Sequence, residues 1–125
     1  MTDYKIYIDN LLIGTIKLEY ADPPMGVVFG KINPIAQFDY AILKNLCKTK
    51  SIDIETEYLE DKFLSTISSE IVKVINSQQT EIKGIVNQIS GMDKFEFEIS
   101  ILGIPYPFFE EEFPHHVKEY ENKFK

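Results

Sequence analysis

Residues 94–102, KFEFEISIL, alternate polar and apolar side chains from Lys94 to Ile101. Successive side chains of a β-strand point to opposite faces, so this period of two predicts a strand with one buried and one exposed face. Residues 81–90 precede it and are separated from it by Gly91-Met92-Asp93. We expect the two segments to form an antiparallel hairpin closed around this turn.

The N-terminal end of the chain shows the same alternation, which predicts strands at residues 4–8 and 12–20. Asp9-Asn10 lies between them and suits a turn, because asparagine tolerates left-handed backbone dihedrals. Gly14 inside the second segment indicates a β-bulge. We therefore expect a second hairpin here.

Shorter strands are expected in the middle of the chain, at residues 27–29 and 51–58. The pattern of residues 62–75 is compatible with either a helix or strands. Their apolar spacing suits a helix, whereas their density of Thr, Ile and Val favours strands. We favour strands for this segment.

One main helix is expected over residues 34–47. Asn33 is a preferred N-cap residue, and Pro34 is a preferred first helical residue. Apolar side chains then recur three and four residues apart, at Ile35, Phe38, Ile42 and Leu46. A short C-terminal helix is expected beyond Pro114, with three inward side chains: Val117, Tyr120 and Phe124. Together the elements predict an α+β fold, a mainly antiparallel twisted sheet with the main helix packed on one face, in a single domain of residues 1–125.

The charge of the chain bears on its partners. Twenty acidic residues against thirteen basic ones give a net charge of −7, and all the basic residues are lysines spread along the sequence. A polyanion would be repelled, and the bidentate arginine contacts that commonly bind phosphate and guanine are missing. The composition therefore disfavours nucleic acid and is compatible with a basic partner.

Cysteine content and hydropathy indicate a compartment. Cys47 is the only cysteine, which excludes an intramolecular disulfide and a cysteine-based zinc cluster and fits reducing cytoplasm. The first ten residues include Asp3 and alternate polar with apolar side chains, unlike a signal peptide. No apolar run reaches the length of a transmembrane helix. We expect a cytoplasmic protein that does not bind membranes.

Residues with catalytic or metal-binding potential are few. Glu110-Glu111-Glu112 precede His115-His116, and carboxylate with imidazole can bind zinc or iron. Adjacent helical residues, however, point about 100° apart, whereas metal-binding histidine pairs sit three or four residues apart. A solvated acidic turn, with one histidine packed at a helix start, is the simpler interpretation.

Cys47 with a histidine and an Asp or Asn could in principle form a nucleophilic triad, but its place on the apolar helix favours a half-buried structural thiol. The sequence contains no GxSxG, HExxH, P-loop or GxGxxG motif. We therefore predict no catalytic, cofactor-binding or metal-binding residues. A small enzyme or metal-binding domain that uses His115, His116 and nearby carboxylates is the alternative.

The segment around residues 51–61 is the predicted partner-binding surface. Asp53, Glu55 and Glu57 alternate with apolar residues and are expected on one strand face. An aromatic residue within a charged rim is common at interfaces. Met25, in the proline-rich loop DPPMG, is either a further contact or part of the core. The predicted partner-binding residues are Asp53, Glu55, Glu57, Tyr58, Glu60, Asp61 and Met25.

Two stretches carry a resemblance. The chain resembles segments of a small uncharacterised bacterial domain family at residues 21–30 (ADPPMGVVFG) and from residues 102–105 (LGIP) through 113–117 (FPHHV). They are turn-forming residues, so the resemblance implies no active site. In size, acidity and expected location the chain also resembles the immunity proteins that neutralise bacterial toxins. That resemblance implies a basic toxin domain as partner.

A third interpretation is a structural or accessory subunit that self-associates through an exposed sheet edge.

Overall fold

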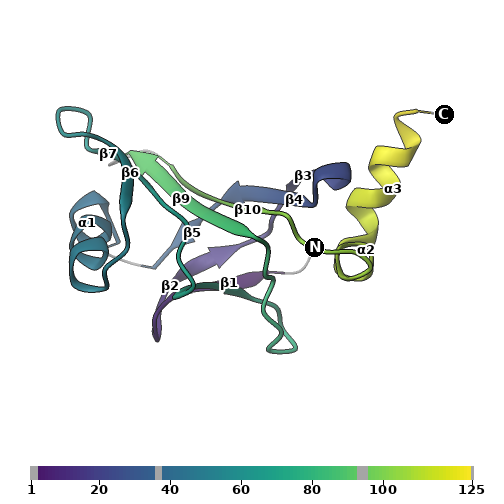
Figure 1. Cartoon of the computed structure of the whole chain (residues 1–125), viewed down its shortest axis with the longest axis horizontal. Coiled ribbons are helices and arrows are strands. Elements are labelled where there is room, and N and C mark those ends of the chain that lie inside the picture. Colours follow the sequence, from purple (N-terminus) through teal and green to yellow (C-terminus); the bar gives the residue numbers. More distant parts are fainter. Residues whose placement is uncertain (1–2, 36–37, 93–95, 125) are drawn as a thin grey trace.

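Two antiparallel sheets and three α-helices make up the described part of the chain, residues 3–35, 38–92 and 96–124 of a computed structural model (Figure 1). The smaller sheet has the strand order β5-β2-β1-β8, and the larger has the order β3-β4-β10-β9-β7-β6. In Figure 1 the larger sheet lies above the smaller one, with α1 at one end and α2 and α3 at the other. The predicted α+β class is confirmed, although with two sheets in place of one.

Each sheet combines strands from distant parts of the chain. The smaller sheet contains β1 (Tyr4–Ile8), β2 (Leu11–Ile16), β5 (Asn33–Pro34) and β8 (Val72–Ile75). The larger contains β3 (Tyr20–Asp22), β4 (Val27–Lys31), β6 (Ile54–Tyr58), β7 (Phe63–Thr66), β9 (Val86–Met92) and β10 (Phe97–Leu102). The helices are α1 (Tyr40–Thr49), α2 (Phe108–Glu112) and α3 (Pro114–Asn122), with a single 3₁₀ turn, η1 (Pro23–Met25).

The predicted hairpin at residues 81–102 is confirmed as β9 and β10, although residues 81–85 precede the first strand. Ile99 lies opposite Ile89, and both side chains are fully buried. Asp93 of the predicted turn lies outside the described residues. The strands favoured for residues 62–75 are also confirmed, as β7 and β8.

The N-terminal hairpin is confirmed as β1 and β2, and Asp9 in its turn has a left-handed φ of 57°. Ile6 lies opposite Gly14 and the next residue opposite Leu12, so Ile13 is the extra residue of a bulge beside Gly14. The predicted strand at residues 12–20 is wrong in one respect. It ends at Ile16, and the chain then crosses to the larger sheet as β3.

The main helix begins six residues later than predicted. Asn33–Pro34 pairs with β2 as the edge strand β5, a position that tolerates proline. The N-cap is Asp39, whose carboxylate accepts a hydrogen bond from the backbone N–H of Ile42 at 2.9 Å. The buried face of α1 is also shifted from the prediction: it consists of Tyr40, Leu43, Leu46 and Cys47.

An aromatic cluster joins the C-terminal helices to the sheets. Phe109 and Phe113 are both fully buried, with ring centroids 5.3 Å apart. Phe113 also contacts the ring of Tyr4 on β1 at 5.9 Å. The C-terminal helix is confirmed, but the prediction that Phe124 faces inward is wrong, because its side chain is 73% exposed. Within the described ranges, none of the helices has the length and hydropathy needed to cross a membrane.

Candidate functional site

A β-bulge divides the predicted acidic patch. The register of β6 against β7 skips one residue between Ile54 and Thr56, which leaves Glu55 as the extra residue. A bulge interrupts the regular alternation of side chains, so Glu55 and Glu57 point to opposite faces of the sheet. The prediction that these two residues share one acidic face with Asp53 is therefore wrong.

Glu57 points toward α1, on the side of the sheet that faces the core. It lies opposite Leu64, whose side chain is fully buried. The Lys44 ammonium is 2.8 Å from the Glu57 carboxylate, and the Tyr40 hydroxyl donates a hydrogen bond to it. The bond from Lys44, followed by that from Tyr40, lowers the pKa of Glu57. Glu57 is thus already paired within the domain.

Glu55 points to the other side. Its carboxylate accepts hydrogen bonds from the Gln88 amide at 3.1 Å and the Ser65 hydroxyl at 3.4 Å. Through these contacts the Glu55 side chain bridges β6 to the neighbouring strand β7 and to β9 beyond it. Its negative charge remains without a cationic partner among the described ion pairs.

We call the side of the six-stranded sheet that points away from the core the outer face. Residues directly opposite each other in paired strands share a face. In the strand register, Tyr20 lies opposite Phe29, Phe29 lies opposite Ser100, and Ser100 lies opposite Gln88. From β3 to β6 the outer face contains Tyr20, Asp22, Val27, Phe29, Lys31, Glu98, Ser100, Leu102, Val86, Gln88, Ser90, Met92, Phe63, Ser65, Glu55, Thr56 and Tyr58.

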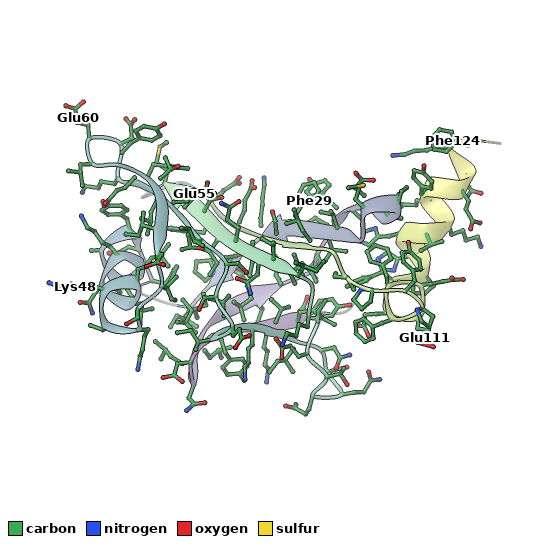
Figure 2. The ribbon with its side chains drawn as sticks, in the orientation of Figure 1. Phe29, Lys48, Glu55, Glu60, Glu111 and Phe124 are labelled. Carbon is green, nitrogen blue, oxygen red and sulfur yellow. The ribbon has the colours of Figure 1, made fainter. Side chains whose placement is uncertain are left out.

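At the β3 end of the outer face, α3 contacts β3, and its residues line a hollow together with Tyr20 and Phe29. Beyond that end, no helix or second sheet of the described residues covers the outer face. The smaller sheet and α1 lie on the opposite side of the larger sheet, and α3 stands at its end (Figure 1). Figure 2 shows Phe29 and Glu55 on the uncovered side. A sheet with one face packed and one face in solvent is ordinary for antiparallel strands, so the side chains on this face decide whether it is functional.

Aromatic rings stand at both ends of the outer face. Tyr20 and Phe29 stack with centroids 5.3 Å apart near the β3 edge, and Tyr58 and Phe63 lie 5.7 Å apart near the β6 edge. Tyr20 is 50% exposed and Tyr58 is 58% exposed. Half-exposed tyrosines among polar side chains are enriched at protein interfaces.

Carboxylates outnumber amines on the same surface. Asp22, Glu55 and Glu98 belong to the outer face, whereas Lys31 is its one lysine among the described residues and lies 2.9 Å from the Glu96 carboxylate. The charges of Lys31 and Glu96 offset each other in this ion pair. The remaining three carboxylates give the outer face a negative potential.

The other predicted contact residues lie at the two edges of this sheet. Glu60 and Asp61 are exposed in the turn after β6, and Met25 follows β3 and is 66% exposed. Met25 is therefore presented to solvent and is not part of the core. The two edges are five strand spacings apart, or about 24 Å. The predicted residues thus flank one wide surface and do not form one compact patch.

A cavity of about 640 Å³ lies where α2 and α3 meet β1. Glu112 lines it, and its carboxylate accepts hydrogen bonds from the Tyr4 hydroxyl at 2.8 Å and the Asn76 amide at 3.0 Å. Burial, followed by the hydrogen bond to Glu112, raises the pKa of Tyr4 well above its usual range. The phenol therefore remains protonated at neutral pH and holds the carboxylate in place.

The two histidines differ in their surroundings. His116 is buried, and its ring Nε2 lies 2.8 Å from the backbone carbonyl of Leu18, so it packs at the start of α3 as expected for one histidine. His115 is exposed and lines the cavity with Glu112. Within the described ranges, no three His, Cys, Asp or Glu side chains lie close enough together to hold a metal ion.

Cys47 lies in α1, at the end of the molecule opposite α3 (Figure 1). The triad with His115 or His116 is therefore excluded by distance. Burial, with a smaller contribution from the charge of Glu57, raises the pKa of the Cys47 thiol. The sequence predicted a half-buried thiol on the apolar helix; Cys47 does lie on α1, but it is more deeply buried than predicted.

The burial of Cys47 predicts slow thiol chemistry. Because the thiolate is the reactive form and the side chain is 2% exposed, an aromatic disulfide reagent should react at least about tenfold more slowly with the folded chain than with the urea-unfolded chain. The release of the coloured thiol measures both rates. Equal rates would show that α1 opens freely in the native state.

Comparison with protein-family models, curated proteins and solved structures found no significant match to this chain.

The outer face was partly visible in the sequence. The alternation of residues 94–102 places Glu98 and Ser100 together on the side opposite the buried isoleucines. Tyr20 and Phe29 could not be assigned to the same surface, because their pairing depends on the crossing of the chain from β2 to β3. Nor did any sequence motif connect Tyr4 with Glu112, which are 108 residues apart.

Proposed function

We propose that this chain is a non-enzymatic binding protein that takes a basic protein partner on its outer face. The observation that supports the proposal is the outer face itself, with half-exposed tyrosines at both ends and three carboxylates that belong to none of the described ion pairs. The tyrosines would serve as anchors, because aromatic residues dominate the energetics of protein interfaces. The carboxylates would select a basic surface and speed its association.

The width of the sheet agrees with this role. A standard interface buries about 800 Å² on each partner, which corresponds to a patch about 30 Å across. The two edges of the outer face are separated by about 24 Å, so one partner could contact both aromatic pairs. Met25 and the turn containing Glu60 and Asp61 would then lie at the rim of the interface.

Within this proposal, the partner is a basic toxin domain such as a nuclease, and the chain is its cytoplasmic immunity protein in a bacterium. This part rests on the net charge of −7 and on the resemblance in size and acidity to immunity proteins. Co-expression of the tagged chain with the product of the neighbouring upstream gene tests it. Co-purification of a basic protein whose toxicity the chain suppresses is the expected result, and the lack of any such gene product would contradict it.

The surface itself is tested by charge reversal. Replacing Glu55 and Glu98 with lysine should weaken binding of that partner at least about tenfold, because attraction becomes repulsion within the proposed interface. Isothermal titration calorimetry measures the affinity. The unfolding midpoint in urea should change little, since both side chains are exposed.

The matched control carries the same change in charge elsewhere. Glu110 and Glu121 are exposed on α2 and α3, and their replacement by lysine should leave the affinity within about threefold of the wild type. If both double variants weaken binding equally, only net charge matters. The outer face would then not be the interface.

A further inference from the structure

The cavity beside α2 and α3 is separate from the outer face. It is lined by Tyr4 and Lys17 from the smaller sheet and its extension, and by Glu111, Glu112 and His115 from the C-terminal helices. Its volume of about 640 Å³ is within the range of small-molecule sites, which is about 300–1,000 Å³. The cavity needs an explanation that the proposed function does not supply.

Glu112 is the one carboxylate of the cavity that is fixed from two sides. The Tyr4 hydroxyl binds Oε2 at 2.8 Å, and the Asn76 amide binds Oε1 at 3.0 Å. Both donors are neutral, so they orient the carboxylate without cancelling its charge. None of the lysines that the structure describes forms an ion pair with Glu112.

The hydrogen bonds leave each oxygen of Glu112 with capacity for another. A carboxylate has about four acceptor positions, and the bonds from Tyr4 and Asn76 use one on each oxygen. One position therefore remains on each of two oxygens that are held in a fixed plane. A planar group with two parallel N–H donors can use one position on each oxygen at once, and among biological cations this is the guanidinium group.

Among the described residues, the other charged groups that line the cavity favour a cation as well. Glu111 and Glu119 contribute two further carboxylates to its wall. Lys17 contributes one ammonium, but this lies 3.0 Å from the Asp3 carboxylate, which offsets its charge. Burial, followed by the neighbouring His116, lowers the pKa of His115, so its imidazole adds less positive charge than an ordinary histidine would.

We propose that this cavity binds a guanidinium group, held in two parallel hydrogen bonds by the carboxylate of Glu112, with the rest of the ligand beside Gln78, Pro114 and His115. The carboxylates are too dispersed among the described residues to enclose a metal ion. They instead suit an extended organic cation. The guanidinium belongs either to a free metabolite or to an arginine side chain of another protein, and the chemistry of recognition is the same for both.

Titration of the full ¹⁵N-labelled chain with butylguanidine tests the site by NMR. Chemical-shift changes should centre on Tyr4, Glu112 and His115 and saturate in the millimolar range or below, about −4 kcal/mol or better. Butylamine, which has the same charge and chain but no planar fork, should bind at least about threefold more weakly. Equal affinity of the two compounds, or no saturable shift with butylguanidine, would overturn the proposal.

Matched variants locate the site. Glu112→Gln should weaken butylguanidine binding at least about tenfold, because it removes the charge and places an amide donor against the ligand. Glu60→Gln removes the same charge from the far end of the molecule, where Figure 2 shows Glu60 well separated from Glu111, and should change nothing. If Glu112→Gln does not fold, the double variant Glu111→Gln with Glu119→Gln replaces it, since both side chains are exposed. Equal loss in the Glu60 variant would contradict a specific site.

A second ligand, a short arginine peptide, distinguishes the two possible sources of the guanidinium group. Acetyl-Gly-Arg-Gly-amide presents the guanidinium as a protein would, whereas butylguanidine presents it as a free molecule. Tighter binding of the peptide assigns the cavity to an arginine of a partner, and tighter binding of butylguanidine assigns it to a metabolite. Either outcome supports the guanidinium site, and it does so whether or not the outer face binds a toxin.

Discussion

Replacement of Phe113 by alanine is expected to lower the free energy of unfolding by about 3–5 kcal/mol, a large part of the 5–15 kcal/mol typical of a domain. Phe113 is fully buried between α2 and α3. Its ring contacts those of Phe109 and His116 and, across to β1, that of Tyr4. Truncation would leave a cavity at the only aromatic junction between the C-terminal helices and the smaller sheet that the described residues contain. Urea denaturation followed by circular dichroism measures the change.

Phe124→Ala is the control. It removes the same side chain from a position that is 73% exposed, so the free energy of unfolding should change by less than about 0.5 kcal/mol. A loss below about 1 kcal/mol for Phe113→Ala would mean that the neighbouring rings collapse into the vacated space. The aromatic cluster would then not be what holds the C-terminal helices in place.

The strands were predictable because the chain alternates cleanly where one face is buried. The segment KFEFEISIL became β10 with Ile99 and Ile101 in the core, as the period of two required. Residues 62–75 became two strands because Thr, Ile and Val stiffen the side chain in the way that a pleated surface accommodates. Local sequence patterns were therefore enough to predict these strands, and with them most of the fold class.

The start of the main helix was not predictable in the same way. Asn33-Pro34 is a good local signal for a helix, yet pairing with β2 places it in a strand. Asp39 is as good a cap as Asn33, and a sequence offers no local means of choosing between them. The pairing of Asn33–Pro34 with β2 leaves Asp39 as the residue that caps the helix.

The candidate surface was predicted in part for a related reason. A single extra residue in β6 reverses the side-chain direction, and this places Glu57 against Lys44 and leaves Glu55 on the outer face. Nothing in the alternation of Ile54, Glu55 and Thr56 marks that residue. The acidic segment was recognised, but its division between two faces depended on the neighbouring strand.

Gly26→Ala is expected to lower the free energy of unfolding by about 2–4 kcal/mol. Gly26 ends η1 with φ at 65°, a region that costs an L-residue about 1–2 kcal/mol. An added Cβ would also lie 2.6 Å from the carbonyl oxygen and 3.0 Å from the backbone nitrogen of Ile104. That backbone cannot swing aside, because the Ile104 N–H donates a 2.9 Å hydrogen bond to the Gly26 carbonyl. Thermal and urea unfolding both measure the loss.

Gly103→Ala separates the two causes. Gly103 has φ at 72°, so alanine meets the same left-handed cost there, but the three atoms nearest to its Cβ all belong to the side chain of Ile85, which is 83% exposed, and not to backbone. Its loss should therefore stay near about 1–2 kcal/mol. The difference between the variants measures the backbone contact that ties the DPPMG loop, and with it the β3 edge of the outer face, to the end of β10. Equal losses would show that the left-handed conformation alone fixes this loop, and Met25 would then be held less firmly than the contact with Ile104 implies.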